Sequence, residues 1–352
     1  MEEHNINIDL MRCVACVAVV AIHVVAVFWY STPISLLSFS EYWENFMLQQ
    51  SDFIVTYKTV NWYILSFIDS VVRFSVPVFV MISGRLILNR SNLDGSYIRK
   101  KILYLIMLIF SWGGVQAAIY LVKCILAKSE FDLIKTILLI VKGPTVFWFL
   151  YMLIPLYFIS PVLCEILRKQ SACIYFFVAW FIGTIVVNSI LSIWPSLNDV
   201  VQLNNIGLFS SYMGYYLFGA HYGKYGMNSK TKYIIYCLGI LSILMMLFCE
   251  PVGFFHNFVT PFNMFWSISV FLFFDGIKLS SHRINKLLQS FSKKTLGIYA
   301  IHVYCIRLIT KIWAPSVSYC ILQVFFYFVF AVVASYVATM ILKKIKFLKR
   351  IV

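Results

Sequence analysis

The sequence is poor in charged residues. Only 12% of its 352 residues are Asp, Glu, Lys or Arg, whereas 61% are hydrophobic and the mean hydropathy is +0.85. Soluble domains carry roughly 25% charged and 45–50% apolar residues, so a soluble fold of this length could not bury so much apolar surface. The same composition excludes a disordered or fibrous chain. It predicts an all-α polytopic membrane protein that forms a single integral-membrane domain over residues 1–352.

The apolar residues are gathered into ten stretches. A helix needs about 20 apolar residues to cross a bilayer, and each stretch except the sixth approaches this length. The predicted spans lie at about 10–30, 62–84, 102–122, 145–165, 172–194, 207–222, 232–249, 260–277, 295–313 and 318–342. Between the third and the fourth, residues 131–141 predict a short helix that either lies on the outer surface or is re-entrant.

Acidic residues are the scarcer charge, with 14 Asp and Glu against 29 Lys and Arg, for a net charge of +15. With the N-terminus in the cytoplasm, the inner connections and the tail hold 20 basic residues and the outer connections hold 5. Lys and Arg accumulate in cytoplasmic loops. The charge therefore predicts ten spans with both termini in the cytoplasm, and we expect no nucleic-acid partner. The other basic residues lie within or beside the spans: Arg12, Arg73, Arg307 and Lys311.

Neither a cleavable signal peptide nor a metal motif is expected. The first nine residues hold Glu2, Glu3 and Asp9 in place of a basic segment. The nine Cys residues form no CxxC pair, and most lie inside apolar runs. We therefore expect them to pack in the core rather than bind a metal.

Three polar residues inside the first two spans are the strongest functional candidates. Arg12 and His23 are eleven residues apart, so they share one helix face at a separation of about 16 Å along the axis. Arg73 lies eleven residues, again about 16 Å, from the inner end of the second span near Gly84. It is therefore at a similar depth to His23, and the two can meet if the spans pack together. A charge near the bilayer centre costs at least about 2.5–3.5 kcal/mol, which favours a function.

Each candidate also has a structural interpretation. Arg12 alone is as well explained by a side chain that reaches the interface. For His23, a hydrogen bond within the core is the less favoured alternative. Arg73, near the middle of the membrane, is harder to explain by packing. Together they suit a phosphorylated cytosolic molecule with a long arm, such as acyl-coenzyme A. Arg12 can hold its phosphates, His23 can act as a general base on a hydroxyl, and Arg73 can hold the thioester oxygen or an anionic acceptor.

Four motifs in order resemble those of the acyltransferase 3 family of membrane-bound acyltransferases. The first span holds R-x10-H, from Arg12 to His23. The second contains RFSVPVFVMISGRLI, the fourth FWFLYMLIPLYFISPVL and the ninth LGIYAIHVY. One departure is Arg85, directly after Ser83 and Gly84, where an aromatic or apolar residue is commoner in the family. Ser83 and Gly84 are interpreted as a helix end rather than as a nucleophile.

The resemblance implies transfer of an acyl group, usually acetyl, from cytosolic acyl-CoA to a hydroxyl of an envelope glycan. Such glycans include the O-antigen of lipopolysaccharide, enterobacterial common antigen, exopolysaccharide, glucan and peptidoglycan. The chain resembles the stand-alone O-acetyltransferases, which lack a fused hydrolase-like domain. The resemblance makes His23 the general base, Arg12 a ligand of the CoA phosphates and Arg73 a second essential polar group. Acetyl-CoA is then a co-substrate, with no permanently bound cofactor and no metal.

Three further residues are predicted to bind substrate. Trp148 and Tyr151, near the outer end of the fourth span, can stack on or hydrogen-bond a sugar, or alternatively belong to an aromatic belt at the membrane interface. His302 shares a face of the ninth span with Tyr299. It either lines the site or makes a structural hydrogen bond.

The expected partners are acyl-CoA, a glycan or lipid-linked saccharide acceptor, and the bilayer of a bacterial inner membrane. The sequence leaves homo-oligomerisation open. A transporter or flippase of a lipid-linked sugar or another anionic substrate is the alternative function, because spans with buried Arg residues also suit anionic cargo. Against it, the two halves of the chain show no paired repeat and no matching spans broken by Gly or Pro.

Overall fold

The computed structural model describes residues 5–28, 59–91, 93–193, 212–248, 257–346 and 348–352. Every regular element within these ranges is a helix. Seven helices are long and apolar enough to cross a membrane, or eight if one bent helix pair is a single span. The prediction of an all-α polytopic membrane protein is confirmed.

The seven spans include three with an irregularity or an unusual length. The second, Val60–Leu88, is divided into α3 (Val60–Val72) and α4 (Ser75–Leu88). The third, α5 (Gly95–Ala127), has 33 residues. Gln170–Leu191 carries a π-helical segment, Phe181–Val186, between α9 (Gln170–Trp180) and α10 (Val187–Ile193). The others are α1 (Ile6–Ala26), α13 (Ser229–Phe248), α17 (Thr295–Ile312) and α18 (Cys320–Lys344).

The count of ten spans stays a prediction, because three of the predicted spans differ from a straight crossing. The fourth is the bent pair α7 (Trp148–Phe158) and α8 (Ser160–Arg168), whose axes meet at 57°. The sixth and eighth are the short helices α12 (Met213–Tyr225) and α15 (Pro261–Asp275), with 13 and 15 residues. These are shorter than the roughly 20 residues of a straight crossing. Residues 207–211 of the predicted sixth span lie outside the described residues.

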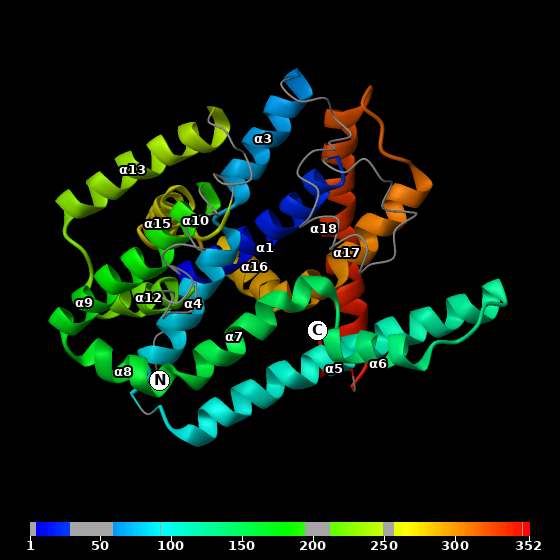
Figure 1. Ribbon diagram of the computed structural model, residues 1–352, viewed down its shortest axis with the longest axis horizontal. Coiled ribbons are helices and arrows are strands. Elements are labelled where there is room, and N and C mark those ends of the chain that lie inside the picture. The colour runs from blue at the N-terminus through cyan, green and yellow to red at the C-terminus, as the bar shows by residue number, and fades with distance from the viewer. Residues whose placement is uncertain (1–4, 29–58, 92, 194–211, 249–256, 347) are drawn as a thin grey trace.

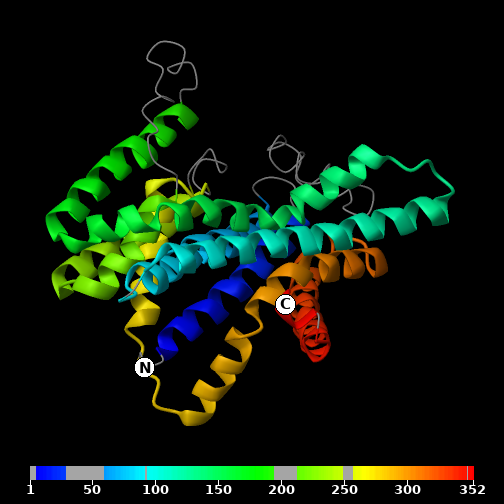
Figure 2. The same ribbon diagram turned by 90° about the horizontal axis from the view of Figure 1, so that it is seen from below.

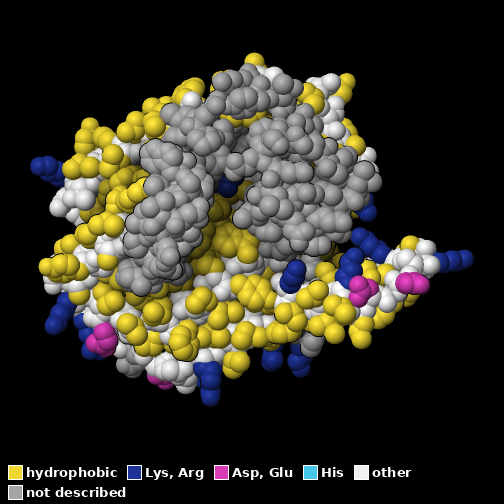
Figure 3. All heavy atoms as spheres, in the orientation of Figure 1, with side chains coloured by type: hydrophobic (Ala, Val, Ile, Leu, Met, Phe, Trp, Pro, Cys, Tyr) yellow, Lys and Arg dark blue, Asp and Glu magenta, His cyan; other side chains and the backbone are white. Residues whose placement is uncertain are grey.

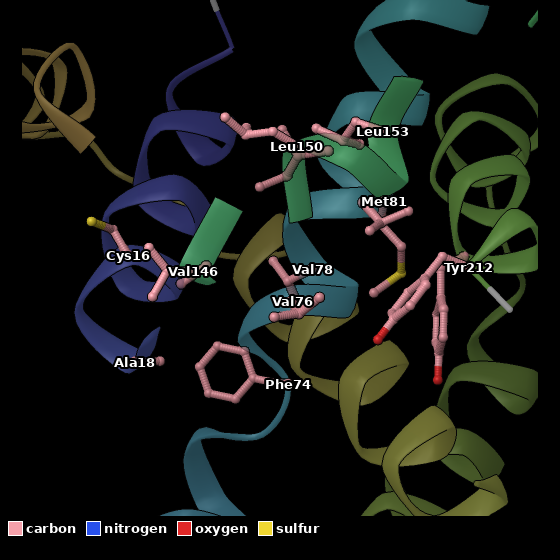
Figure 4. Packing of buried hydrophobic residues seen from close by; sticks show 14 of the residues in the cluster. Cys16, Ala18, Phe74, Val76, Val78, Met81, Val146, Leu150, Leu153 and Tyr212 are labelled. Atoms are coloured by element: carbon pink, nitrogen blue, oxygen red, sulfur yellow. The ribbon is translucent and has the colours of Figure 1, made fainter. Parts of the chain in front are cut away.

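Helix α1 lies at the centre of the molecule. It packs against α3, α4, α15, α17, α18 and the short α16 (His282–Ser292), and Figure 1 shows it surrounded by these helices. Most of its residues are buried, which agrees with a helix that is apolar on all sides. Figure 4 shows side chains of α1, α4 and α7 in this core, together with Tyr212, which directly precedes α12. Polar residues on α1 therefore face protein rather than lipid.

Small residues allow α4 and α12 to pack closely. A Cβ atom on Gly84 of α4 would overlap the backbone oxygen of Tyr216, and one on Gly219 of α12 would overlap the backbone oxygen of Met81. Glycine permits such backbone contact between helices in membranes. The interpretation of Ser83 and Gly84 as a helix end was wrong, because α4 continues to Leu88. Gly84 instead marks the contact with α12.

Helix α6 (Leu133–Lys142) folds back along α5. A Cβ atom on Gly113, near the middle of α5, would overlap the backbone oxygen of Ile140, and Gly143 lies against Ile109. Figures 1 and 2 both show α6 alongside α5. Whether α6 lies on the outer surface or is re-entrant stays a prediction, but this packing brings the start of α7 into the interior of the helix bundle, where Val146 and Phe147 are buried.

Hydrophobic side chains cover much of the surface that is not buried. Ile125 of α5 is 75% exposed and Phe158 of α7 is 77% exposed, and Figure 3 shows hydrophobic atoms across one face with Lys and Arg mainly near its rim. In a polytopic membrane protein such side chains face lipid. Outside the spans, Asp94 caps α5, and hydrogen bonds from the Tyr97 amide and the Ser96 hydroxyl lower the pKa of its carboxyl group.

Candidate active site

His23 of α1 and His302 of α17 lie beside one another. Their ring centroids are 5.1 Å apart and the ring planes are inclined by 43°. His302 is fully buried, and His23 is partly buried near the C-terminal end of α1. The two predicted site histidines therefore come together from helices nearly 280 residues apart in sequence.

The backbone of α17 fixes the ring of His302. Its Nδ1 atom lies 2.7 Å from the Tyr299 carbonyl oxygen and 3.2 Å from the Ile298 carbonyl oxygen. Both partners only accept hydrogen bonds, so Nδ1 is the donor and carries a proton. In the neutral ring, Nε2 is then an acceptor. This Nε2 atom is buried and has no hydrogen-bond partner among the described residues.

Arg73 lies at the junction between α3 and α4. Its Nε atom donates to Oδ2 of Asp69 over 2.6 Å, and Arg73 and Asp69 are 8% and 1% exposed. Its guanidinium carbon also lies 5.4 Å from the ring centroid of Phe258. Sequence reasoning missed Asp69. The signal was an acid four residues before a buried Arg on the same helix, which is the spacing of an intrahelical ion pair.

The charges of Arg73 and Asp69 lie within electrostatic range of the His23 ring. This agrees with α1 packing against both α3 and α4, whereas a direct contact between His23 and Arg73 stays a prediction. The arrangement gives one buried polar cluster of two imidazole rings, a guanidinium group and a carboxylate. Titratable side chains that are buried beside a charged pair are common in catalytic sites.

The two aromatic residues of the fourth span are placed differently. The ring centroid of Trp148 lies 6.3 Å from that of Phe258 and 6.0 Å from that of Tyr212. Phe258 is the ring that lies over the Arg73 guanidinium. Tyr151 is 41% exposed, and its hydroxyl donates to the Val141 carbonyl of α6. Trp148 is therefore separated from Arg73 by the Phe258 ring, whereas Tyr151 connects α7 to α6.

Arg12 lies at the other end of α1 from His23. Because α1 is one continuous helix, the two side chains share a face about 16 Å apart, as the spacing predicts. Arg12 is partly buried, within electrostatic range of Asp9 and of Tyr157 on α7. Asp9 in turn accepts a hydrogen bond of 2.6 Å from the Ser292 hydroxyl of α16. Arg12 thus lies near polar groups of α1 and α7, and Asp9 joins this end of α1 to α16.

The family model described as an acyltransferase domain (Acyl_transf_3) matches residues 5–341, which is nearly the whole chain. The chain belongs to the acyltransferase 3 family. It is therefore an acyltransferase, and the transporter alternative is set aside. A search of the curated proteins finds no match, and a search of the solved structures finds none either.

The departure at Arg85 of this acyltransferase has a structural explanation. The Arg85 guanidinium donates to the carboxylate of Asp275 at the end of α15. The backbone oxygen of Asp275 accepts a hydrogen bond of 2.6 Å from the Asn7 side chain. Arg85 thus joins α4 to α15 and, through Asp275, to the start of α1. It is a structural residue at the same end of the bundle as Arg12.

Proposed function

We propose that this acyltransferase moves an acetyl group from cytosolic acetyl-CoA to a sugar hydroxyl of a bacterial surface or lipid-linked polysaccharide, with His23 as the general base. The supporting observation is the position of His23. It lies beside His302 and the Arg73–Asp69 pair, on the same helix face as Arg12. A base in such a position can act on a substrate that extends along α1 from Arg12.

The reaction follows from these groups. The sugar hydroxyl oxygen attacks the thioester carbonyl carbon while an unprotonated ring nitrogen of His23 takes the hydroxyl proton. The carbonyl π electrons move to the oxygen and then return to expel the CoA sulfur, which breaks the C–S bond. The proton on His23 passes to the thiolate. The products are the sugar acetate ester and CoA thiol, and His23 regains its starting state.

The two arginines have separate proposed roles. Arg12, at the predicted cytoplasmic end of α1, binds the CoA phosphates through its fixed guanidinium geometry. The pantetheine arm then extends about 16 Å along α1 toward His23. Arg73 stabilises the negative charge that develops on the thioester oxygen. Asp69 keeps the guanidinium oriented, since one of its N–H groups is already bound to the carboxylate.

The acceptor is proposed to approach from the opposite side of the membrane, past Trp148. A Trp ring one side chain away from Arg73 offers a flat apolar surface to a sugar ring. Tyr151 stays a predicted acceptor contact. We propose a bacterial inner-membrane location, because the basic residues lie mostly in the connections assigned to the cytoplasm.

The test uses purified protein reconstituted with membrane glycan and acetyl-CoA labelled in the acetyl group. We expect label in an alkali-labile ester, and a loss of about 10²–10⁴-fold in rate for His23→Ala. His221→Ala is the matched control, because His221 lies in α12 beside an apolar cavity of about 270 Å³ lined by residues such as Phe177 and Met264. Full activity of a stably inserted His23→Ala protein would exclude His23 as the base. Label transferred to an amine would exclude a hydroxyl acceptor.

A further inference from the structure

The general-base role of His23 depends on which of its two ring nitrogens carries the proton. A neutral imidazole has one N–H and one lone pair, and only the nitrogen with the lone pair can take a proton. His23 therefore needs a partner that holds its N–H, so that the other nitrogen faces the substrate. The side chain whose ring lies beside His23 is His302, with the two ring centroids 5.1 Å apart.

His302 offers an acceptor beside His23, at its Nε2 atom. The proton on Nδ1 of His302 is held by the Tyr299 and Ile298 carbonyls, so Nε2 carries the lone pair. This atom is fully buried and has no partner in the described part of the chain. A buried acceptor without a hydrogen bond costs about 1–3 kcal/mol. Such a cost is offset when a donor from His23 reaches it.

The ring separation suits such a bond. Two imidazoles joined by an N–H···N hydrogen bond of about 2.9 Å have their centroids about 5 Å apart, because each ring adds its own radius. The observed separation is 5.1 Å, and the ring planes are inclined by 43°, so the rings are not stacked face to face.

We propose that His302 is a positioning residue for the acyl transfer: its Nε2 accepts the N–H of His23 and thereby directs the other His23 nitrogen at the acceptor hydroxyl. The chain of bonds runs from the α17 carbonyls through His302 to His23. When His23 takes the proton, its N–H becomes a stronger donor, and the bond to His302 strengthens. This inference rests on the proposed role of His23 as the base, and replaces direct substrate contact as the function of His302.

The test compares two substitutions of His302. In His302→Gln the amide oxygen reaches the place of Nε2 and can still accept a hydrogen bond, whereas His302→Phe keeps a ring without an acceptor. We expect His302→Phe to lower kcat on the order of 10²-fold or more, as expected when a base loses its oriented tautomer, with the KM values of both substrates unchanged. We expect His302→Gln to recover at least a tenth of the wild-type kcat. His221→Phe controls for replacing a partly buried His by Phe.

Two further measurements separate this inference from the proposed function. Nitrogen-15 NMR of imidazole-labelled protein should show one neutral tautomer of His23 in the wild type and in His302→Gln, and a mixture in His302→Phe. In a His23→Ala background, His302→Phe should cause no further loss, because residues that act as a unit are not additive. Equal loss in the Gln and Phe variants, a rise in KM in place of the fall in kcat, or an unchanged tautomer would overturn the role of His302. Activity retained by His23→Ala alone would instead overturn the proposed base.

Discussion

Arg73 and Asp69 form an ion pair of 2.6 Å one turn apart, at the end of α3 where the second span is interrupted. Asp69 is almost completely buried, so the pair lies where an isolated charge would be very unfavourable. Desolvation makes such a pair a weak source of net stability, yet removal of one partner leaves the other charge buried and uncompensated. The pair thus holds the Arg73 guanidinium in one orientation beside His23.

Asp69→Ala should therefore lower the free energy of unfolding by about 3–5 kcal/mol, the cost of an uncompensated buried charge. Asp69→Asn keeps an oxygen acceptor for the Arg73 Nε–H group, so it should lower the free energy of unfolding by less than Asp69→Ala does. The measurement is the thermal unfolding midpoint in detergent, together with the rate of acyl transfer. Glu165→Ala serves as the control, because the Glu165–Arg168 pair of 2.8 Å is exposed and contributes at most about 1 kcal/mol. Equal stability losses in the Asp69→Ala and Glu165→Ala proteins would contradict the burial argument.

Arg12→Ala should chiefly raise the KM for acyl-CoA. Arg12 lies about 16 Å from His23 along α1, too far to touch the reacting atoms, so its removal should weaken donor binding and leave kcat within a few-fold of wild type. Initial rates at varied acyl-CoA and saturating acceptor test this. Arg12→Lys keeps the charge without the planar guanidinium, so its KM for acyl-CoA should lie between those of Arg12→Ala and the wild type. A fall in kcat at unchanged KM would place Arg12 in the chemical step rather than in donor binding.

The sequence predicted the first-span geometry well, because a single helix fixes the Arg12–His23 spacing from its rise per residue alone. The approach of His302 to His23 depends on how α17 packs against α1, and no local pattern encodes that distance. Asp69 was overlooked because the sequence search followed the basic residues within the spans. Arg85 looked anomalous until its partner Asp275, on another helix, was known. The number of spans was hardest to predict where helices are bent or short. Hydropathy depends on the length of an apolar segment, and it does not reveal a bend such as the 57° between α7 and α8.

Trp148 and Tyr151 offer a test of which aromatic residue meets the acceptor. Trp148 adjoins Phe258 and Tyr212 beside Arg73, so Trp148→Ala should raise the acceptor KM by about 3–10-fold, in line with an aromatic contact of about 0.5–1.5 kcal/mol. Tyr151→Phe loses the hydrogen bond to the Val141 carbonyl and should reduce stability by about 1 kcal/mol, with little change in acceptor KM. Acceptor titrations and unfolding midpoints of both variants are the measurements. A raised acceptor KM in Tyr151→Phe would restore Tyr151 as a sugar contact.

Two adjacent glycines of α5 test the fold-back of α6. A Cβ atom on Gly113 would overlap the backbone oxygen of Ile140 in α6, whereas one on Gly114 has nothing within 4 Å. Gly113→Ala should therefore force α6 away from α5 at a cost of about 1–3 kcal/mol, and a lower unfolding midpoint reports this. Gly114→Ala should be neutral or stabilising by up to about 1 kcal/mol, because Ala is the better helix former. Because α6 leads into η1 (Thr145–Phe147), whose Val146 carbonyl accepts from Tyr299, Gly113→Ala should also slow acyl transfer. If both variants unfold at the wild-type temperature, α6 does not pack on α5 as described.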